Sequence, residues 1–128
     1  MKTILVIDDN EAICETLEIF FKEKGFNVLT AGNGNIGMAL LNDNHVDLVI
    51  LDMIMPEKDG VETLLDLEKF SSKVPIIVIS GGREIPPEFY LKTAEKLGVK
   101  YTFRKPFDRN DILLAVNEAL KDVEHKYN

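Results

Sequence analysis

Five short apolar runs, spread evenly along the chain, limit the folds that this sequence can adopt. Each run is apolar at nearly every position, rather than at alternate positions, and the runs are rich in β-branched side chains. This pattern is typical of strands that are covered on both faces of a sheet. The predicted strands cover residues 3–8, 27–31, 47–52, 75–80 and 100–104.

The segments between these runs have the apolar spacing of amphipathic helices. The second of them is marked by Ile36, Ala39 and Leu40. The last has the clearest stripe, made of Ile112, Ala115, Val116, Ala119, Leu120 and Val123. Gly25 and Gly98 follow helical patterns, where a left-handed cap is expected. Five strands alternating with five helices predict an α/β fold, in which right-handed crossovers give a parallel sheet with helices on both faces.

Composition excludes several kinds of protein. The chain has 128 residues, 45% hydrophobic and 29% charged, which predicts one folded domain. A formal net charge of −7 argues against a broad basic surface for nucleic acid, and the single cysteine, Cys14, excludes a disulfide framework. No apolar stretch approaches the length of a membrane span, and no signal-peptide pattern is present. We expect a cytoplasmic domain over residues 1–124 with a frayed tail at 125–128, and no nucleic-acid or membrane partner.

Polar side chains stand at the ends of four of the predicted strands. The first strand ends in Asp8 and Asp9, the third in Asp52 and the fourth in Ser80, and the fifth leads directly into Lys105. Parallel strands bring their carboxyl ends to one edge of the sheet, where open α/β sheets bind ligands. We therefore expect these side chains to meet in one site.

Three carboxylates at one sheet edge repel one another, so they raise pKa values or recruit a cation. Oxygen ligands of this kind suit a hard divalent ion, and Mg²⁺ is the natural candidate because it binds carboxylates together with phosphate. Lys105 adds an ammonium and Ser80 a hydroxyl, which together with the metal make a cradle for a phosphoryl group. Asp52, central in the row, is the best candidate for a carboxylate nucleophile.

These residues carry a close resemblance to the receiver domain of response regulators in two-component phosphorelay systems, over essentially the whole chain. The chain is most similar to the single-domain, chemotaxis-regulator-like members. The motifs that match are Asp8–Asp9, the stretch 52–60, Ser80 and Lys105-Pro106-Phe107. The resemblance implies a flavodoxin-like three-layer (βα)5 fold with a five-stranded parallel sheet in the order 2-1-3-4-5.

The resemblance also implies a role for each site residue. Asp52 accepts a phosphoryl group from a histidine of a sensor histidine kinase or phosphotransfer protein. Ser80 bonds a phosphoryl oxygen, Lys105 pairs with the phosphoryl group, and the Lys105–Pro106 peptide bond is cis. The implied Mg²⁺ ligands are Asp8, Asp9, Asp52 and the backbone carbonyl of Ile54.

The output implied by the resemblance is contact with a protein target. The face made by the fourth helix, fifth strand and last helix is expected to form that contact, through Lys92, Lys96, Lys100 and Thr102. A chain of 128 residues has no room for a DNA-binding or catalytic output domain, and the initiating Met1 favours a standalone protein. We expect a phosphoacceptor with slow autodephosphorylation rather than a turnover enzyme.

Three departures from the family pattern concern the expected switch region, which comprises Ser80, Gly81, Gly82, Thr102 and Pro106. Thr102 stands where the family has an aromatic residue, three positions before the lysine. Its neighbours Tyr101 and Phe103 point to the opposite face of a strand, so neither replaces it. Gly82 stands where the family often has a polar side chain that orients water, which predicts slow hydrolysis of the aspartyl phosphate. The segment from Ser80 to Lys105 is also longer than is common.

Three alternatives stay open. A flavin-binding domain of similar architecture needs a phosphate-binding loop after the first strand, where this chain has acidic residues. A haloacid-type phosphatase has an Asp-x-Asp-x-Thr signature, and residues 8–12 lack its second aspartate and threonine. A pseudo-receiver, which is an interaction module that is not phosphorylated, lacks one or more pocket residues, whereas this chain keeps them all.

Overall fold

Five parallel strands form one sheet, as expected from the sequence. The computed structural model describes residues 1–54, 60–70, 74–81 and 87–127. The strand order is β2-β1-β3-β4-β5, which confirms the flavodoxin-like order 2-1-3-4-5. The strands are β1 (Thr3–Ile7), β2 (Asn27–Ala31), β3 (Leu48–Asp52), β4 (Ile76–Ser80) and β5 (Tyr101–Arg104). Four predicted runs extend one residue beyond the observed strand.

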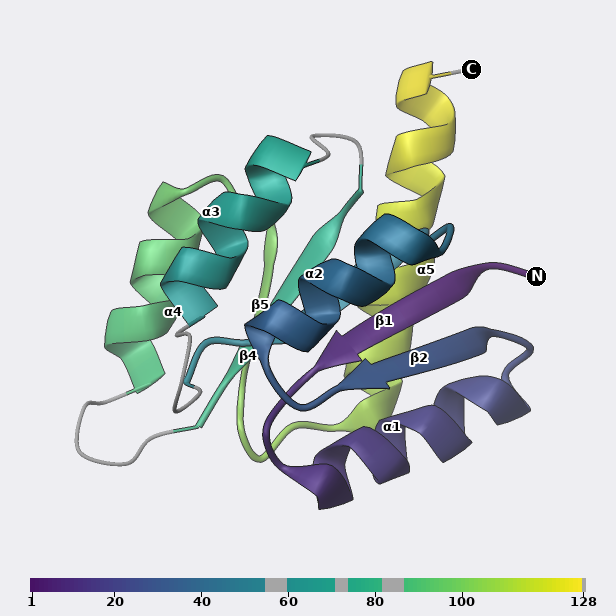
Figure 1. Ribbon diagram of the computed structural model, residues 1–128, viewed down its shortest axis with the longest axis horizontal. Coiled ribbons are helices and arrows are strands. Elements are labelled where there is room, and N and C mark those ends of the chain that lie inside the picture. Colours follow the sequence, from purple (N-terminus) through teal and green to yellow (C-terminus); the bar gives the residue numbers. More distant parts are fainter. Residues whose placement is uncertain (55–59, 71–73, 82–86, 128) are drawn as a thin grey trace.

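The helices alternate with the strands along the chain (Figure 1). They are α1 (Glu11–Glu23), α2 (Gly34–Asp43), α3 (Gly60–Phe70), α4 (Pro87–Lys96) and α5 (Arg109–Tyr127). Since α5 continues to Tyr127, the domain boundary expected at residue 124 stays a prediction. No helix in the described ranges is both long and apolar enough to cross a bilayer.

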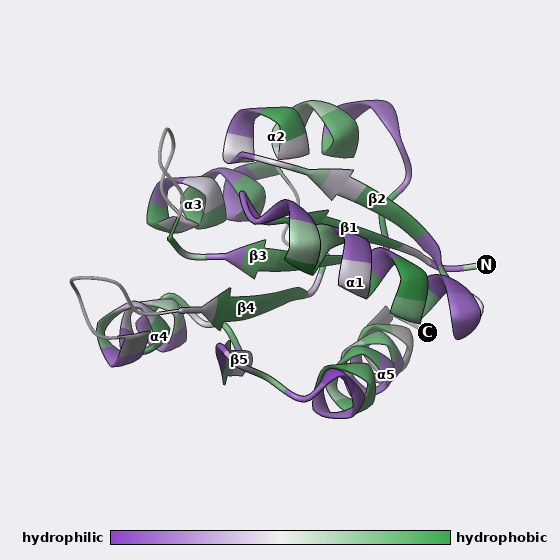
Figure 2. Ribbon diagram, turned by 90° about the horizontal axis from the view of Figure 1, so that it is seen from below, coloured by the Kyte–Doolittle hydropathy of each residue, from purple (hydrophilic) through white to green (hydrophobic). Residues whose placement is uncertain are grey.

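Both faces of the sheet are covered, which explains why the strands are apolar at successive positions. Ile4 and Val6 of β1 pack in the cluster shared with α1 and α5, whereas Leu5 and Ile7 pack in the cluster shared with α2, α3 and α4. All four are fully buried. In Figure 2 the central strands β1, β3 and β4 are largely apolar, whereas the helices are of mixed character.

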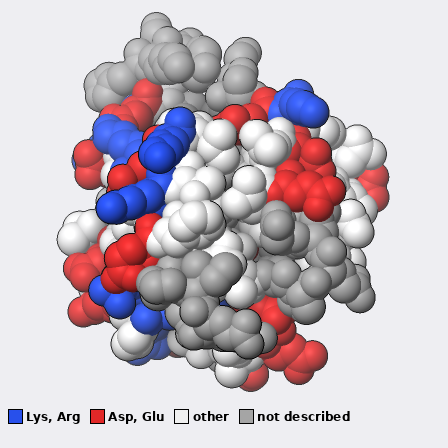
Figure 3. Space-filling view, turned by 90° about the vertical axis from the view of Figure 1, so that its left-hand side faces the viewer, with Lys and Arg blue, Asp and Glu red and all other residues white. Residues whose placement is uncertain are grey.

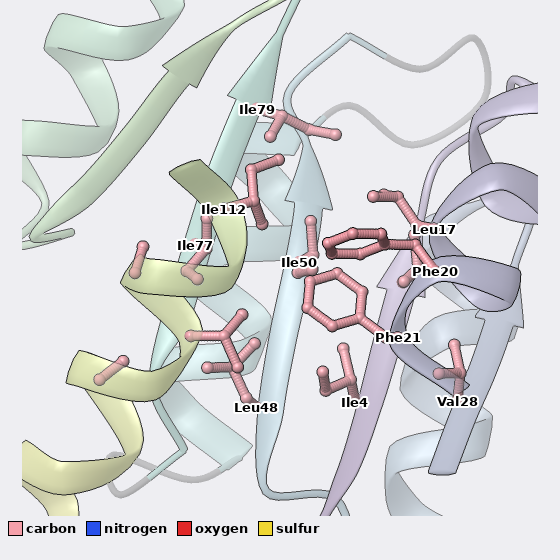
Figure 4. Close-up of a cluster of buried hydrophobic side chains, with 14 of the residues drawn as sticks. Ile4, Leu17, Phe20, Phe21, Val28, Leu48, Ile50, Ile77, Ile79 and Ile112 are labelled. Atoms are coloured by element: carbon pink, nitrogen blue, oxygen red, sulfur yellow. The ribbon is translucent and has the colours of Figure 1, made fainter. Parts of the chain in front are cut away.

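The layer under α1 is built around aromatic packing. Phe21 is fully buried and stacks edge to face on Phe20 and Phe26, with ring centroids 5.1 and 5.7 Å apart. In Figure 4, Leu17, Phe20 and Phe21 point from α1 toward Ile4 and Ile50 of the sheet. This packing fixes α1 against the strands that carry the acidic residues.

Helix ends follow the sequence signals. The side chain of Asn10 accepts hydrogen bonds from the amides of Ala12 and Ile13, which begins α1 directly after the acidic pair. Gly25 and Gly98 have φ values of 93° and 95°, as expected for residues that end α1 and α4.

The predicted apolar stripe of the second helix is wrong at Ile36 and Ala39, which are exposed, whereas Leu40 packs against the core. Ile36 is 49% exposed, and the buried residues of α2 are Gly34, Gly37 and Leu41. Gly37 lies so close to β1 that an added Cβ would be 2.5 Å from Cδ1 of Ile7. A glycine that allows close approach carries no hydrophobic signal, so the pattern pointed to its neighbour.

Gly60→Ala is expected to destabilise the fold. Gly60 begins α3, its amide donates to the carbonyl of Met53, and an added Cβ would lie 2.2 Å from Met53 Cα. Because backbone lies on the other side of this contact, we expect a loss of about 3 kcal/mol in the free energy of unfolding, measured by urea denaturation.

Gly32→Ala is the matched control, since nothing lies within 4 Å of its added Cβ. Its effect should be under about 0.5 kcal/mol. Equal losses in the two variants would contradict the steric explanation.

Candidate functional site

Three acidic residues meet at the carboxyl edge of the sheet. Asp8 follows β1, Asp9 is next to it, and Asp52 is the last residue of β3, the neighbouring strand. One carboxylate oxygen of each lies within 4.8 Å of those of the other two. The structure therefore brings together the acidic residues that the sequence analysis selected.

Asp8 is held at several atoms. It is 1% exposed, its amide donates to the carbonyl of Ala31 at 3.0 Å, and its Oδ1 accepts from the amide of Asn10 at 2.9 Å. Its Oδ2 lies 2.9 Å from Nζ of Lys105, but in a direction that makes an ion pair rather than a hydrogen bond. This oxygen is buried and keeps the capacity to bind another group.

Asp52 is buried to the same degree, at 2% exposed. Its Oδ1 accepts from the amide of Ile54 at 3.2 Å, and its Oδ2 lies 3.5 Å from Nζ of Lys105. Burial raises the pKa of Asp52 to about 7, and the charge of Asp8 adds to the shift, while Lys105 opposes it. One ammonium thus does not compensate for the two buried carboxylates.

Lys105 follows β5, a strand at one edge of the sheet, and its side chain extends toward these carboxylates. Its amide donates to the carbonyl of Ser80 at 2.8 Å, and its stem passes Gly81, where an added Cβ would be 3.2 Å from Lys105 Cδ. The Lys105–Pro106 peptide bond is cis, as the resemblance implied.

Ser80 is fully buried at the end of β4, and its Oγ has no hydrogen-bond partner among the residues that the structure describes. Buried polar atoms rarely lack a hydrogen bond, so Ser80 Oγ, together with Asp8 Oδ2, which Lys105 approaches as an ion pair only, indicates that the site is shaped for a further group. The donor set of three carboxylates fits a hard divalent cation such as Mg²⁺.

The described switch residues lie on different elements: Ser80 ends β4 and Gly81 follows it, Thr102 lies on β5, and Pro106 follows Lys105. Thr102 Oγ1 donates to Oε1 of Glu95 on α4, at a long 3.5 Å. Tyr101 and Phe103 pack instead in the cluster shared with α1 and α5, so neither takes the place of an aromatic residue at position 102. Gly82 lies outside the described residues, and so does the inference on hydrolysis drawn from it.

Sequence reasoning missed two residues that act on Asp8, because neither Asn10 nor Cys14 was among the predicted site residues. The amide of Asn10 donates to Asp8 Oδ1. Sγ of Cys14 donates to the backbone carbonyl of Asp8 at 3.2 Å. Burial raises the pKa of the Cys14 thiol to about 11. No motif marks such contacts, because they depend on how the first turn of α1 leaves the strand.

A groove of about 280 Å³ runs beside Asp8 along α1 and has an acidic lining. It is lined by Asp8, Glu11, Cys14, Glu15, Glu18, Thr30, Ala31 and Gly32. Such a surface attracts cations and repels the phosphate of a flavin nucleotide, which argues against the flavin-binding alternative.

Comparison with known proteins gives consistent results. Residues 4–117 match the family model described as response regulator receiver domain. The chain is 30% identical over 118 residues to the transcriptional regulatory protein GlrR of Escherichia coli, a match covering 92% of the chain and 26% of GlrR. It is 32% identical over 121 residues to the transcriptional regulatory protein CpxR of Klebsiella pneumoniae, covering 94% of the chain and 50% of CpxR. The chain therefore spans half or less of these relatives.

A solved structure matches along its whole length. The crystal structure of a response regulator receiver domain protein from Clostridium thermocellum has a TM-score of 0.88 and 28% sequence identity to this chain. The match covers 97% of this chain and 98% of that one.

The raised pKa of Asp52 predicts an unusual effect of pH on stability. Between pH 3.8 and about 7 the folded protein keeps a proton on Asp52 that the unfolded chain has lost, so wild-type stability falls as pH rises through this interval. Asp52→Asn is neutral at every pH. Without metal it should be more stable than wild type by up to about 4 kcal/mol at pH 8, a difference that vanishes near pH 4.

Urea unfolding in the presence of a chelator, at intervals from pH 4 to pH 8, measures this difference. Asp43→Asn, which neutralises an exposed aspartate, serves as the control and should show no such trend. A stability difference for Asp52→Asn that stays constant over the whole range would contradict the prediction.

Proposed function

The chain belongs to the response regulator receiver domain family, and we propose that it is a phosphorylation-dependent signalling switch whose phosphoacceptor is Asp52. Receiver domains of two-component response regulators are phosphoacceptors, and they interact with histidine kinases or phosphotransfer proteins. The proposed donor is a phosphohistidine of such a partner. A cytoplasmic location, expected from the sequence, stays part of this proposal.

The observation that carries the proposal is the placement of Asp52 between a carboxylate cluster and an ammonium. In the proposed step an oxygen of Asp52 forms a bond to phosphorus, and the phosphorus–nitrogen bond of the donor breaks with its electron pair going to the imidazole. Lys105, with Nζ 3.5 Å from Asp52 Oδ2, would pair with the phosphoryl oxygens. The hydroxyl of Ser80 would donate a hydrogen bond to one of these oxygens, which would give its buried Oγ a partner.

Mg²⁺ would be held by Asp8, Asp9, Asp52 and the backbone carbonyl of Ile54. When bound, the ion supplies neutralisation of negative charge as phosphoryl group and carboxylate approach each other. The amide of Ile54 already binds Asp52 Oδ1, so this backbone segment lies against the acidic cluster. The acidic groove along α1 would raise the local concentration of the cation.

The proposed output is contact with a protein target through the face made by α4, β5 and α5. Lys92, Lys96 and Arg104 are exposed there, as are the apolar side chains of Phe89 and Leu114. Figure 3, which views the molecule from the side of α4, shows most of the basic side chains on one side of this view, interspersed with acidic ones, whereas the charged side chains on the other side are mainly acidic. With Thr102 in place of an aromatic residue, we propose a soft switch without aromatic rotation.

Mass spectrometry after incubation with acetyl phosphate and Mg²⁺ tests the phosphoacceptor. Wild type should gain one phosphoryl group, and Asp52→Asn should gain none because it lacks the nucleophile. Asp43→Asn, a control at an exposed aspartate, should gain one like wild type. An unmodified wild type would overturn the proposal and favour the pseudo-receiver alternative. Phosphorylation of the Asp52→Asn variant would show that Asp52 is not the acceptor.

Removal of one proposed ligand should weaken the metal site. Asp9→Asn is expected to raise the Mg²⁺ dissociation constant at least about tenfold, measured by isothermal titration calorimetry, because a carboxylate of the cluster is lost. Glu11→Gln removes the same charge from the adjacent groove without touching the cluster, and should change the constant less than about twofold. Equal effects of the two substitutions would mean that the negative electrostatic potential of this region, rather than direct ligation by Asp9, accounts for Mg²⁺ binding.

A further inference from the structure

The backbone of Asp8 is fixed by partners from three parts of the chain. Its amide donates to Ala31 at the end of β2, and its Oδ1 accepts from the amide of Asn10. Its carbonyl accepts from the thiol of Cys14, on the first turn of α1, with Sγ 3.2 Å from the oxygen. The remaining polar atom of Asp8 is Oδ2, which lies 2.9 Å from Nζ of Lys105 in the candidate site.

Cys14 ties the start of α1 to the residue after β1 through its side chain, which reaches back to the carbonyl of Asp8. Its amide makes the first hydrogen bond of the helix, to the carbonyl of the N-cap Asn10 at 3.1 Å. The same side chain is 9% exposed and packs in the cluster of α1 and α5. The apolar contacts and the hydrogen bond together hold the Cys14 side chain in one orientation. Through the same hydrogen bond, Cys14 holds the backbone carbonyl of Asp8.

We propose that Cys14 is a positioning residue for Asp8: its S–H···O=C hydrogen bond orients the β1–α1 junction so that Asp8 Oδ2 faces the metal site. This inference rests on the proposed function, because it assigns Asp8 to Mg²⁺. The orientation of a metal ligand by a group behind it affects metal affinity, and its loss typically weakens binding by about ten- to a hundredfold. Cys14 acts on the backbone of the ligand, so the lower end of this range is expected.

Three substitutions separate the hydrogen bond from packing. Cys14→Val removes the donor and fills the site with a slightly larger apolar side chain, Cys14→Ala removes both donor and volume, and Cys14→Ser keeps a donor in a similar shape. The Mg²⁺ dissociation constant should rise about tenfold in the valine and alanine variants and stay within about threefold of wild type in the serine variant. Thermal unfolding in the same buffer without metal shows whether affinity follows stability instead.

The outcomes distinguish the two proposals. Failure of wild type to bind Mg²⁺ overturns the proposed function. Normal Mg²⁺ binding by wild type and by Cys14→Val leaves the function standing and overturns the positioning role. The positioning role is also overturned if Cys14→Ser binds Mg²⁺ as weakly as Cys14→Val. The same holds if the Mg²⁺ affinities of the variants follow their melting temperatures rather than the presence of a donor.

Infrared spectroscopy gives a second readout that needs no folded variant. Cys14 is the only cysteine of the chain, so the S–H stretching band of wild type reports this bond alone. The proposal predicts a band lowered in frequency, as for a hydrogen-bonded thiol, that rises to the free-thiol position when the protein is unfolded in urea. A free-thiol band in the folded protein would overturn the proposal.

Discussion

The burial of two carboxylates beside a single ammonium governs the structure of the site. Asp8 and Asp52 are 1% and 2% exposed, and two such charges about 4 Å apart repel by roughly 4 kcal/mol at an effective dielectric near 20. Lys105 approaches both, at 2.9 and 3.5 Å, yet the pKa of Asp52 is still raised to about 7. The cluster therefore keeps an excess of negative charge, which a divalent cation would relieve. The proposed affinity for Mg²⁺ thus rests on how the fold places these acidic residues.

The strand order decides how Lys105 can reach these carboxylates. It follows β5, at the edge of the sheet, whereas Asp52 ends β3 and Asp8 follows β1, with β4 lying between. Neighbouring strands are about 4.8 Å apart, so the side chain must pass over the end of β4. The residue there is Gly81, and the lysine stem occupies the space that a side chain would take. The side chain of Lys105 can therefore take this course because residue 81 is a glycine. No single sequence motif contains both residues.

Much of the fold was predictable because burial on both faces leaves a plain pattern. The continuous apolar runs predicted the strands to within a residue, and their acidic ends predicted which side chains meet. The strand order came from the resemblance, since periodicity does not order strands. Patterns failed where contact depends on closeness or on rotamers: Gly37 was passed over for Ile36, and nothing in the spacing indicated that Cys14 would reach the carbonyl of Asp8.

The two sides of the site differ in how firmly they are held, and this bears on signalling. On the β1 side, Asp8 has partners at its amide, carbonyl and Oδ1, all within buried or half-buried surroundings. On the β5 side, α4 is tied to the strand by the exposed ion pair Arg104–Glu88 and by the long hydrogen bond of Thr102. Exposed ion pairs contribute about 0–1 kcal/mol each, so little electrostatic energy resists a shift of α4. In the proposed switch, a phosphoryl group that accepted a hydrogen bond from Ser80 would then displace the β5 side of the site relative to the β1 side. Such a displacement would give a graded response without an aromatic side chain that rotates.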